Sequence, residues 1–465
     1  MTTFRPLEES ANERGLHPIS LREVARGIHR LGARFVRTGL TTPRIREENA
    51  LPHAMNRTSE ENLRRGGLKV LLLENIHASG RELFEEAGLT VESHLGALSE
   101  DALCERVGDV HVLGIRSKTH VTPRVLNAAP GLLSIGCFCI GTNQVDLGRA
   151  NARGVPVFNA PFSNTRSVAE MIIAEVVMLA RQLGDRVIET HAGRWRKVSA
   201  GCYEVRGKTL GIVGYGHIGS QVGVLAEAMG MRVVFYDIAT RLPMGNNQPC
   251  ASLHELLSRS DFVTLHVPAT PQTHRMIGPD ELAAMRAGSY LLNASRGTVV
   301  QIPSLAEALR AGHLAGAAID VFPEEPETNS DGFESELRGL ANVVLTPHIG
   351  GSTMEAQAAI GREVATSLRK FIETGATTGS VNFPNVELAP SPGTHRVLNV
   401  HRNVPGVLRD INRIVSDHGA NIHSQVLSTD ATIGYLIMDI ERDVSEAVSQ
   451  GVASLPTNIR TRVVY

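Results

Sequence analysis

Three residues of different chemistry each follow a short apolar run in the second half of the chain; they are Arg296, Glu325 and His348. A histidine titrates near neutrality and can accept a hydroxyl proton, and a carboxylate bonded to its ring raises the imidazole pKa and fixes its orientation. An arginine can hold a carboxylate through two parallel hydrogen bonds. Taken singly, the three also fit a surface arginine, a solvated loop acid and a histidine at a helix entry. Their joint placement favours a site that moves a proton and a hydride on a hydroxy acid.

A glycine-rich loop, Gly214–Gly219, lies between an apolar strand and a helix. Gly214 permits a tight turn, Gly216 lets the backbone approach a pyrophosphate, and Gly219 lets the helix pack closely on the strand. The N-terminus of the helix supplies free N–H groups for the phosphates. The alternative is a structural strand-turn-helix unit that holds no ligand.

Asp237 ends the next apolar strand, Arg232–Tyr236. Its carboxylate can accept hydrogen bonds from the hydroxyls of an adenosine ribose and would repel a 2′-phosphate. The loop and this acid together predict a dinucleotide site that takes NAD rather than NADP.

The elements that must position these residues alternate between strands and helices. Strands interleaved with helices imply parallel sheets with helices on both faces, and ligands bind beyond the carboxyl ends of such strands. The expected strands of a first set are 68–73, 110–115, 132–135 and 155–158, with helices at 80–87 and 168–181. The expected strands of a second set are 210–213, 232–236, 262–266, 289–293, 316–320 and 343–346, followed by a helix at 353–373.

The last segment has a pattern of its own, after a linker rich in Gly, Ser, Thr and Pro at 375–393. Its expected strands are 396–401, 421–427, 432–441 and 459–464, and its expected helices are 406–418 and 445–454. This order, βαββαβ, predicts a ferredoxin-like module.

Composition limits the function classes. The chain has 465 residues, 42% of them hydrophobic, and a formal net charge of −2. Nucleic-acid binding needs a clear basic excess, and no apolar run approaches the ~20 residues that span a bilayer. The five cysteines are few and odd in number, which favours free thiols in a reducing compartment, and we expect a cytoplasmic protein. Cys137 and Cys139 have no further ligand pair nearby, so we expect buried thiols and no metal site.

Residues 1–67 differ from the rest of the chain in their pattern of charged and apolar residues. Arginines at positions 22, 26, 30 and 34 lie among apolar residues three or four apart, which fits an amphipathic helix. Such a leader is typical of an organelle transit peptide, although early acids such as Glu8 and Glu13 argue against one. The main expectation is a disordered extension, and Met55 is an alternative start.

Several long segments carry a resemblance to a known family. They are Gly136–Asp146, Asn159–Glu170, Gly214–Gly219, Asn293–Val300 and Leu345–Thr353. With Arg296, Glu325 and His348 they make residues 68–465 similar to the D-isomer-specific 2-hydroxy acid dehydrogenases. The resemblance implies two Rossmann-like domains of α/β class: a discontinuous substrate-binding domain (68–163 and 352–380) and an NAD-binding domain (164–351).

The resemblance also implies roles for individual residues. Arg296 and Glu325 would be catalytic and His348 the acid/base, while Arg116, Ser117 and Lys118 would face a substrate phosphate unless they form a solvated loop. Trp195 and Lys197 would approach the site from a neighbouring subunit. The implied NAD contacts are Gly214, Gly216, His217, Ile218, Gly219, Asp237, Ala294, Ser295, Arg296, Asp320, His348, Ile349, Gly350 and Gly351.

The C-terminal module (394–465) resembles an ACT domain, a regulatory sensor of amino acids, through the segment His401–Leu408. The resemblance makes His401, Asn403 and Asn421 candidate ligands for L-serine at an interface between modules. A plain helix entry at Pro405-Gly406 is the alternative. A homotetramer built partly through paired modules is implied as well.

Within the family the likeness is to enzymes that oxidise 3-phospho-D-glycerate to 3-phosphohydroxypyruvate with NAD⁺, the first step of L-serine synthesis, under serine feedback. The alternatives are reduction of 2-oxoglutarate to D-2-hydroxyglutarate, and an NADH-sensing corepressor that binds partner proteins. One departure is Gln301, which stands where many relatives carry an acid, so hydrogen bonding there is in doubt.

Overall fold

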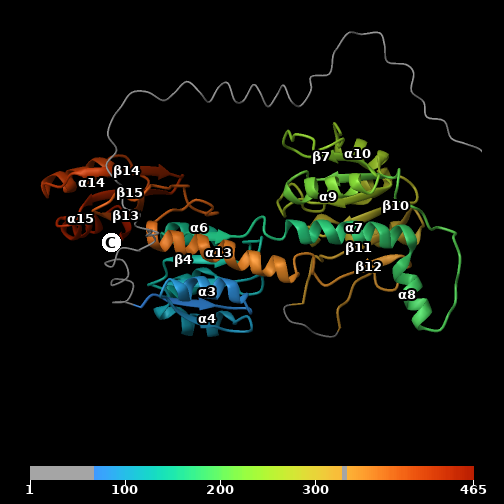
Figure 1. The fold of residues 1–465 in the computed structure, drawn as a ribbon, viewed down its shortest axis with the longest axis horizontal. Coiled ribbons are helices and arrows are strands. Elements are labelled where there is room, and N and C mark those ends of the chain that lie inside the picture. The colour runs from blue at the N-terminus through green and yellow to red at the C-terminus, as the bar shows by residue number, and fades with distance from the viewer. Residues whose placement is uncertain (1–66, 327–331, 465) are drawn as a thin grey trace, which may run out of the picture. The chain divides into compact units, whose positions relative to one another are not determined.

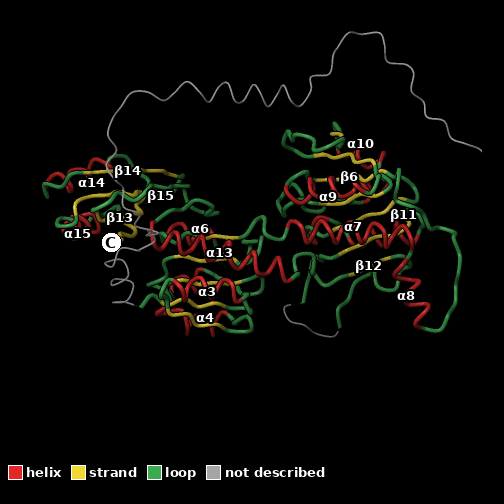
Figure 2. Tube along the Cα trace, viewed as in Figure 1, coloured by secondary structure: helices red, strands yellow, loops and turns green. Residues whose placement is uncertain are grey.

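The computed structural model describes residues 67–326 and 332–464, which form three sheets (Figure 1). The expectations for residues 1–66, including the leader and the alternative start at Met55, lie outside the described residues. Helices and strands alternate along most of the described chain (Figure 2).

The first sheet has five parallel strands in the order β2-β1-β3-β4-β5. Its strands are β1 (Lys69–Leu72), β2 (Thr90–Ser93), β3 (Val112–Ile115), β4 (Ser134–Cys137) and β5 (Val157–Asn159). Its helices are α3 (Ala78–Glu86), α4 (Glu100–Arg106), α5 (Pro123–Ala128) and α6 (Leu147–Ala152), with a 3₁₀ turn η1 (Val107–Asp109). Helices α4, α5 and α6 share one hydrophobic core with the sheet, and α3 belongs to a second core.

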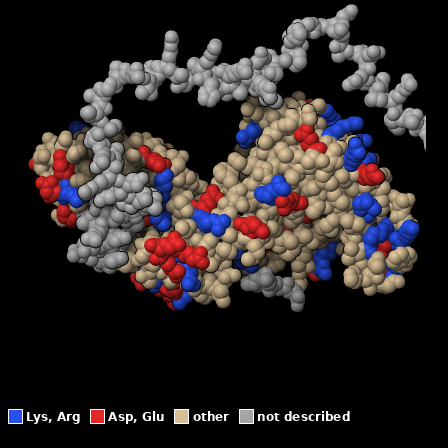
Figure 3. Space-filling model, in the orientation of Figure 1, with Lys and Arg blue, Asp and Glu red and all other residues tan. Residues whose placement is uncertain are grey.

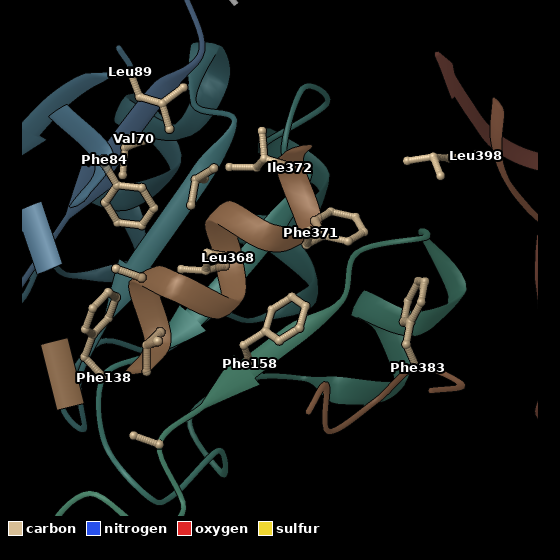
Figure 4. Packing of buried hydrophobic residues seen from close by; sticks show 14 of the residues in the cluster. Val70, Phe84, Leu89, Phe138, Phe158, Leu368, Phe371, Ile372, Phe383 and Leu398 are labelled. Atoms are coloured by element: carbon tan, nitrogen blue, oxygen red, sulfur yellow. The ribbon is translucent and has the colours of Figure 1, made fainter. Parts of the chain in front are cut away.

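A helix from much later in the chain, α13 (Met354–Thr374), completes that second core against α3, β4 and β5. Leu368, Phe371 and Ile372 of α13 lie among the buried side chains Phe84 and Phe158 (Figure 4). Burial of side chains this large supplies much of the free energy that holds a helix on a sheet. The chain therefore leaves the first sheet, builds the second, and returns through α13.

The second sheet has seven parallel strands in the order β12-β11-β10-β9-β6-β7-β8. Its strands are β6 (Thr209–Val213), β7 (Arg232–Tyr236), β8 (Gln248–Pro249), β9 (Phe262–Leu265), β10 (Ser289–Asn293), β11 (Leu314–Ile319) and β12 (Val343–Leu345). Its helices are α7 (Thr165–Arg181), α8 (Leu183–His191), α9 (His217–Ala228), α10 (Leu253–Arg259), α11 (Pro279–Ala284) and α12 (Ile302–Arg310), with a 3₁₀ turn η2 (Gly297–Val299). Helices α7 and α9 share one core with the sheet, and α10, α11 and α12 share another, so both faces are covered.

The third sheet has four antiparallel strands in the order β14-β15-β13-β16, with two helices, and confirms the expected βαββαβ module. Its elements are β13 (Thr394–Arg402), α14 (Val407–Asp417), β14 (Ile422–Thr429), β15 (Ile433–Glu441), α15 (Ser445–Ala453) and β16 (Asn458–Val464). Val397, Leu436 and Met438 share a core with the helices, whereas Leu398 and Tyr435 belong to the core that contains α13. This alternation is the period of two expected of a strand.

Arginines of the third sheet hold the C-terminal end of α13. Arg462 donates to the carbonyl oxygens of Phe371 (3.0 Å) and Ile372 (3.2 Å), and Arg396 donates to that of Thr374 (3.0 Å). The last carbonyls of a helix have no partner within the helix, and cationic donors satisfy them well. The final turn of α13 is therefore tied to the C-terminal module.

The α/β class with two Rossmann-like sheets and a ferredoxin-like module is confirmed. Two strands were not predicted from the sequence, because neither has the apolar run of a buried strand. β2 is an edge strand without a buried residue, and β8 is a two-residue edge strand that contains a proline. Among the described residues, no helix combines the length and the apolar character needed to cross a membrane.

Candidate active site

The three glycines of the loop after β6 have different surroundings. A side chain at Gly214, whose φ is 90°, would collide with the carbonyl of His266, and one at Gly219 would collide with the carbonyl of Gly214. A Cβ at Gly216 would meet nothing within 4 Å. The outer glycines are thus required by packing, whereas Gly216 leaves open space where a pyrophosphate can approach.

Helix α9 begins at His217, directly after this open glycine, and no side chain caps its first turn. Its N–H groups are available to an anion, and the helix dipole favours one. The ring of His217 lies 3.9 Å from that of Phe162, centroid to centroid, and Ile218 packs partly into the core of the second sheet. The residues present therefore fit the phosphates of a dinucleotide.

Asp237 lies beside the glycine loop, as the ribose site requires. Its carboxylate accepts hydrogen bonds from the N–H groups of Tyr215 (2.9 Å) and Ala239 (2.9 Å), and Arg241 donates to it at 3.3 Å. Only 9% of its side chain is exposed. The acid predicted to distinguish NAD from NADP is therefore fixed to the loop predicted to bind the phosphates.

Arg296 lies in a turn that Asn293 organises at the end of β10. Asn293 accepts hydrogen bonds from the N–H (3.0 Å) and the hydroxyl (2.8 Å) of Ser295 and donates to the carbonyl of Arg296 (3.0 Å). Burial lowers the pKa of Arg296, and the acid Glu325 opposes this. The guanidinium is thus largely desolvated, which strengthens its attraction for a carboxylate.

His348, the predicted acid/base, and Glu325, a predicted catalytic residue, lie in hydrogen-bond contact. The imidazole Nδ1 lies 2.8 Å from the Oε2 atom of Glu325, and the Oε1 atom accepts the N–H of Phe322 at 3.0 Å. The hydrogen bond from Glu325 raises the pKa of His348, whereas burial acts in the opposite direction. With Nδ1 occupied, Nε2 is the nitrogen left to exchange a proton with a substrate.

Asp320 shapes the turn that carries His348. It is 1% exposed, and its carboxylate accepts hydrogen bonds from the Thr346 hydroxyl (2.6 Å) and the N–H groups of Ile349 (2.8 Å) and Gly350 (2.9 Å). His348 itself has a φ of 54°, unusual for a residue other than glycine. Both oxygens of Asp320 are thus engaged within the protein, and its contact with NAD stays a prediction.

The cationic segment Arg116–Lys118 follows β3 and lies near the catalytic arginine. Gln144 donates to the carbonyl of Arg116 (2.6 Å) and to the sulfur of Cys139 (3.4 Å). Burial raises the pKa of Cys139 to about 11, although the charges of Arg116 and Arg296 both act to lower it. Both arginines therefore lie close enough to one partly buried thiol for their charges to act on it.

Glu74 and Gln144, which organise this segment, were missed in the sequence. The only local signal was a polar residue directly beyond a buried strand, in the case of Glu74. Single polar residues of this kind carry no periodicity, and their partners lie far away in sequence.

The candidate serine ligands do not all converge within one chain. His401 is 3% exposed and lies against Gly434, and Asn403 donates to the carbonyl of Asp430 (2.6 Å). Asn421 precedes Ile422, which pairs with Ile440, whereas His401 pairs with Gly434. Six positions along β15 (440 minus 434) correspond to about 20 Å.

Trp195, which is 86% exposed, and Lys197, also exposed, lie in a segment whose residues 191–200 are all exposed.

Comparison with known proteins places this geometry in a family. The family described as D-isomer specific 2-hydroxyacid dehydrogenase, NAD binding domain, matches residues 173–350, and an AHAS small subunit-like ACT domain matches residues 398–460. The chain is 59% identical to D-3-phosphoglycerate dehydrogenase of Dictyostelium discoideum over 398 residues, covering 86% of this chain and 97% of the relative. It is 52% identical to D-3-phosphoglycerate dehydrogenase of Escherichia coli strain K12 over 407 residues, covering 87% and 99%.

Among solved structures, D-lactate dehydrogenase of Aquifex aeolicus in complex with NAD and lactic acid is similar at 27% identity. Its TM-score is 0.60, and the match covers 68% of this chain and all of that one (100%). The relatives and the NAD-binding domain show that the protein is an NAD-dependent oxidoreductase, and Arg296, Glu325 and His348 are its predicted catalytic residues. The chain belongs to the D-isomer specific 2-hydroxyacid dehydrogenase family.

Proposed function

We propose that the protein oxidises 3-phospho-D-glycerate to 3-phosphohydroxypyruvate with NAD⁺, as the first step of L-serine synthesis. The observation that carries this proposal is the 2.8 Å hydrogen bond between His348 and Glu325. These residues follow strands of the same sheet as the one that precedes the glycine loop Gly214–Gly219. The relatives at 59% and 52% identity are named for this substrate.

The residues divide the reaction between them. When NAD⁺ is bound, its nicotinamide accepts the hydride from the carbon that bears the hydroxyl. His348 takes the hydroxyl proton at Nε2, and Glu325 stabilises the imidazolium that forms. Arg296 holds the substrate carboxylate through parallel hydrogen bonds. The carbon thus loses a hydride to the nicotinamide, its hydroxyl oxygen loses a proton to His348, and the alcohol becomes a ketone.

The substrate phosphate is assigned to Arg116, Ser117 and Lys118. Two cationic side chains and a hydroxyl suit a phosphate dianion. The charges of Arg116 and Arg296 both lower the pKa of the Cys139 thiol, so the two arginines lie in the same region. The first sheet with α13 (68–163 and 352–380) would then be the substrate domain, and residues 164–351 the NAD domain.

The C-terminal module (394–465) would sense L-serine and inhibit the enzyme. His401 and Asn403 of one chain would meet Asn421 of a second, because these residues lie at opposite ends of β15 within one chain. This fits a homotetramer in which paired modules create the effector site, while Trp195 and Lys197 reach a neighbouring active site. We further propose that the enzyme works in the cytoplasm.

One assay tests the main proposal: NADH formation from 3-phosphoglycerate, with and without L-serine, repeated with His348→Ala. Turnover by the wild type and its loss in the variant support the proposal. Oxidation of another hydroxy acid such as D-2-hydroxyglutarate without phosphoglycerate turnover would refute the substrate. Binding of NADH without turnover of any hydroxy acid would favour a corepressor, and insensitivity to serine would refute the regulation alone.

On the face shown in Figure 3, acidic and basic residues are interspersed. This distribution, with the net charge of −2, supports a small-molecule enzyme over a nucleic-acid partner.

A further inference from the structure

Glu74 is a buried carboxylate in an unusual backbone conformation. It lies two residues after the end of β1, only 8% of its surface is exposed, and its φ is 63°. A left-handed φ is costly for a residue other than glycine, and it persists where the surroundings require it. Burial of a charged group is costly as well, unless hydrogen bonds replace water.

Three hydrogen bonds to the carboxylate of Glu74 come from one turn, the segment after β3. Its Oε1 atom accepts the N–H groups of Arg116 (3.1 Å) and Thr119 (2.9 Å), and its Oε2 atom accepts that of Lys118 (3.0 Å). On the carbonyl side of the same turn, Gln144 donates to the oxygen of Arg116 at 2.6 Å. The backbone of this turn is therefore held from both sides by buried side chains.

This arrangement has a consequence for how the turn can bind an anion. The N–H groups of Arg116, Lys118 and Thr119 point at Glu74, so they are not available to a phosphate. With these three N–H groups engaged, side chains are left as the main donors to the anion, and those of Ser117 and Lys118 are exposed. The direction in which these side chains leave the turn depends on the backbone that Glu74 fixes.

We propose that Glu74 is a positioning residue for recognition of the substrate phosphate, acting through the three main-chain N–H groups of the turn that carries Arg116 and Lys118. This inference rests on the proposed function, in which that turn faces the phosphate. Glu74 touches neither substrate nor cofactor in this scheme. Its effect is on selectivity between a phosphorylated substrate and its dephosphorylated counterpart.

The test compares two substrates that differ only in the phosphate, phosphohydroxypyruvate and hydroxypyruvate, by following NADH oxidation in the full-length enzyme. In Glu74→Gln an amide group faces N–H donors, so at least one hydrogen bond is lost. We expect kcat/KM for phosphohydroxypyruvate to fall by about tenfold or more, mainly through KM, as loss of a charge-assisted hydrogen bond implies. The kcat/KM of the variant for hydroxypyruvate should stay within about twofold of the wild-type value.

Glu85→Gln is the matched control, because Glu85 lies on α3 and pairs with Arg81 at the surface (2.8 Å). It should leave both substrates unchanged. If Glu74→Gln does not fold, Glu74→Asp serves in its place, because it keeps the charge and only withdraws the carboxylate by one methylene. An equal loss on both substrates, or no loss on either, would overturn the proposal, since a purely structural role predicts no change in preference.

A double variant, Arg116→Ala with Lys118→Ala, separates the two proposals. If it abolishes the preference for the phosphorylated substrate and Glu74→Gln leaves that preference unchanged, the phosphate site stands and the role of Glu74 is wrong. If the double variant retains the preference, the assignment of the phosphate site is wrong, and the inference on Glu74 falls with it.

Discussion

At the scale of single residues, the hydrogen bond between His348 and Glu325 governs the protonation of the proposed base. The hydrogen bond from Glu325 raises the pKa of His348 because it stabilises the imidazolium, which also forms when the base accepts a proton. Since the pKa of His348 in the folded protein lies above its ordinary value, the hydrogen bond stabilises the fold fully at pH values below the ordinary pKa. This stabilisation is lost as the pH rises through the raised pKa.

The first prediction concerns Glu325→Gln. Hydroxyl oxidation needs neutral His348, so the acidic limb of the profile of kcat/KM against pH reports its pKa. The variant should move this limb to lower pH and lower the plateau by about 10²-fold, the order expected for a weakened acid/base. Steady-state kinetics across pH measure both effects. Glu324→Gln, an exposed neighbour, is the control, and an unmoved limb in Glu325→Gln would contradict the assignment.

The second prediction concerns cofactor choice. Arg241 donates to Asp237 at 3.3 Å, so the acid neutralises a cation that lies next to the ribose site. Asp237→Ser should unmask this cation for a 2′-phosphate and raise the ratio of NADP to NAD use by at least about tenfold, equivalent to ~1.4 kcal/mol. Initial rates with each cofactor measure the ratio. The gain should vanish in Asp237→Ser with Arg241→Ala; if it persists, Arg241 is not its source.

At the scale of elements, the turn from β6 into α9 combines packing and binding in one short segment. Gly219 serves the packing, because a side chain there would meet the carbonyl of Gly214. Gly216 serves the binding, because the space beside it is open. Within the six positions Gly214–Gly219, glycine is therefore required for two different reasons, packing at Gly219 and access for the cofactor at Gly216.

The third prediction separates these reasons. Gly219→Ala should destabilise the fold by about 1–3 kcal/mol, the usual effect of overpacking, whereas Gly216→Ala should leave stability nearly unchanged. Gly216→Ala should instead weaken NAD binding, because its methyl group occupies the open space. Thermal unfolding without cofactor and NAD titration distinguish the two variants. Equal loss of stability in both would show that Gly216 also has a packing role.

At the scale of the whole molecule, α13 links the active site to the C-terminal module. The side chain of Gln357 donates to the carbonyl of Gly351 in the His348 turn (3.0 Å), close to the start of the helix. At its other end, Arg396 and Arg462 hold the last carbonyls, and Arg396 is also paired with the buried Asp439 at 2.7 Å. One helix thus contacts the catalytic turn and the third sheet.

The fourth prediction concerns this buried ion pair. Arg396 and Asp439 have 6% and 1% of their side chains exposed, so removal of the arginine leaves an uncompensated buried charge. Arg396→Met should destabilise the protein by about 3–5 kcal/mol, measured by denaturant unfolding. Arg409→Met, at an exposed pair with Asp410, is the control. Wild-type stability in Arg396→Met would show that the pair is not needed to hold the module.

The sequence by itself determined the glycine loop, Asp237, the residues Arg296, Glu325 and His348, and the βαββαβ order of the last segment. These follow from local periodicity and from the rule that ligands bind at the carboxyl ends of parallel strands, so neighbouring positions carry the signal.

Only the tertiary structure decided that Glu74 holds the turn of Arg116 and that Asn421 lies far from His401 within one chain. Each of these depends on contacts between residues distant in sequence. Such contacts are set by packing and by the pairing of buried polar groups, which leave no periodic trace in the chain.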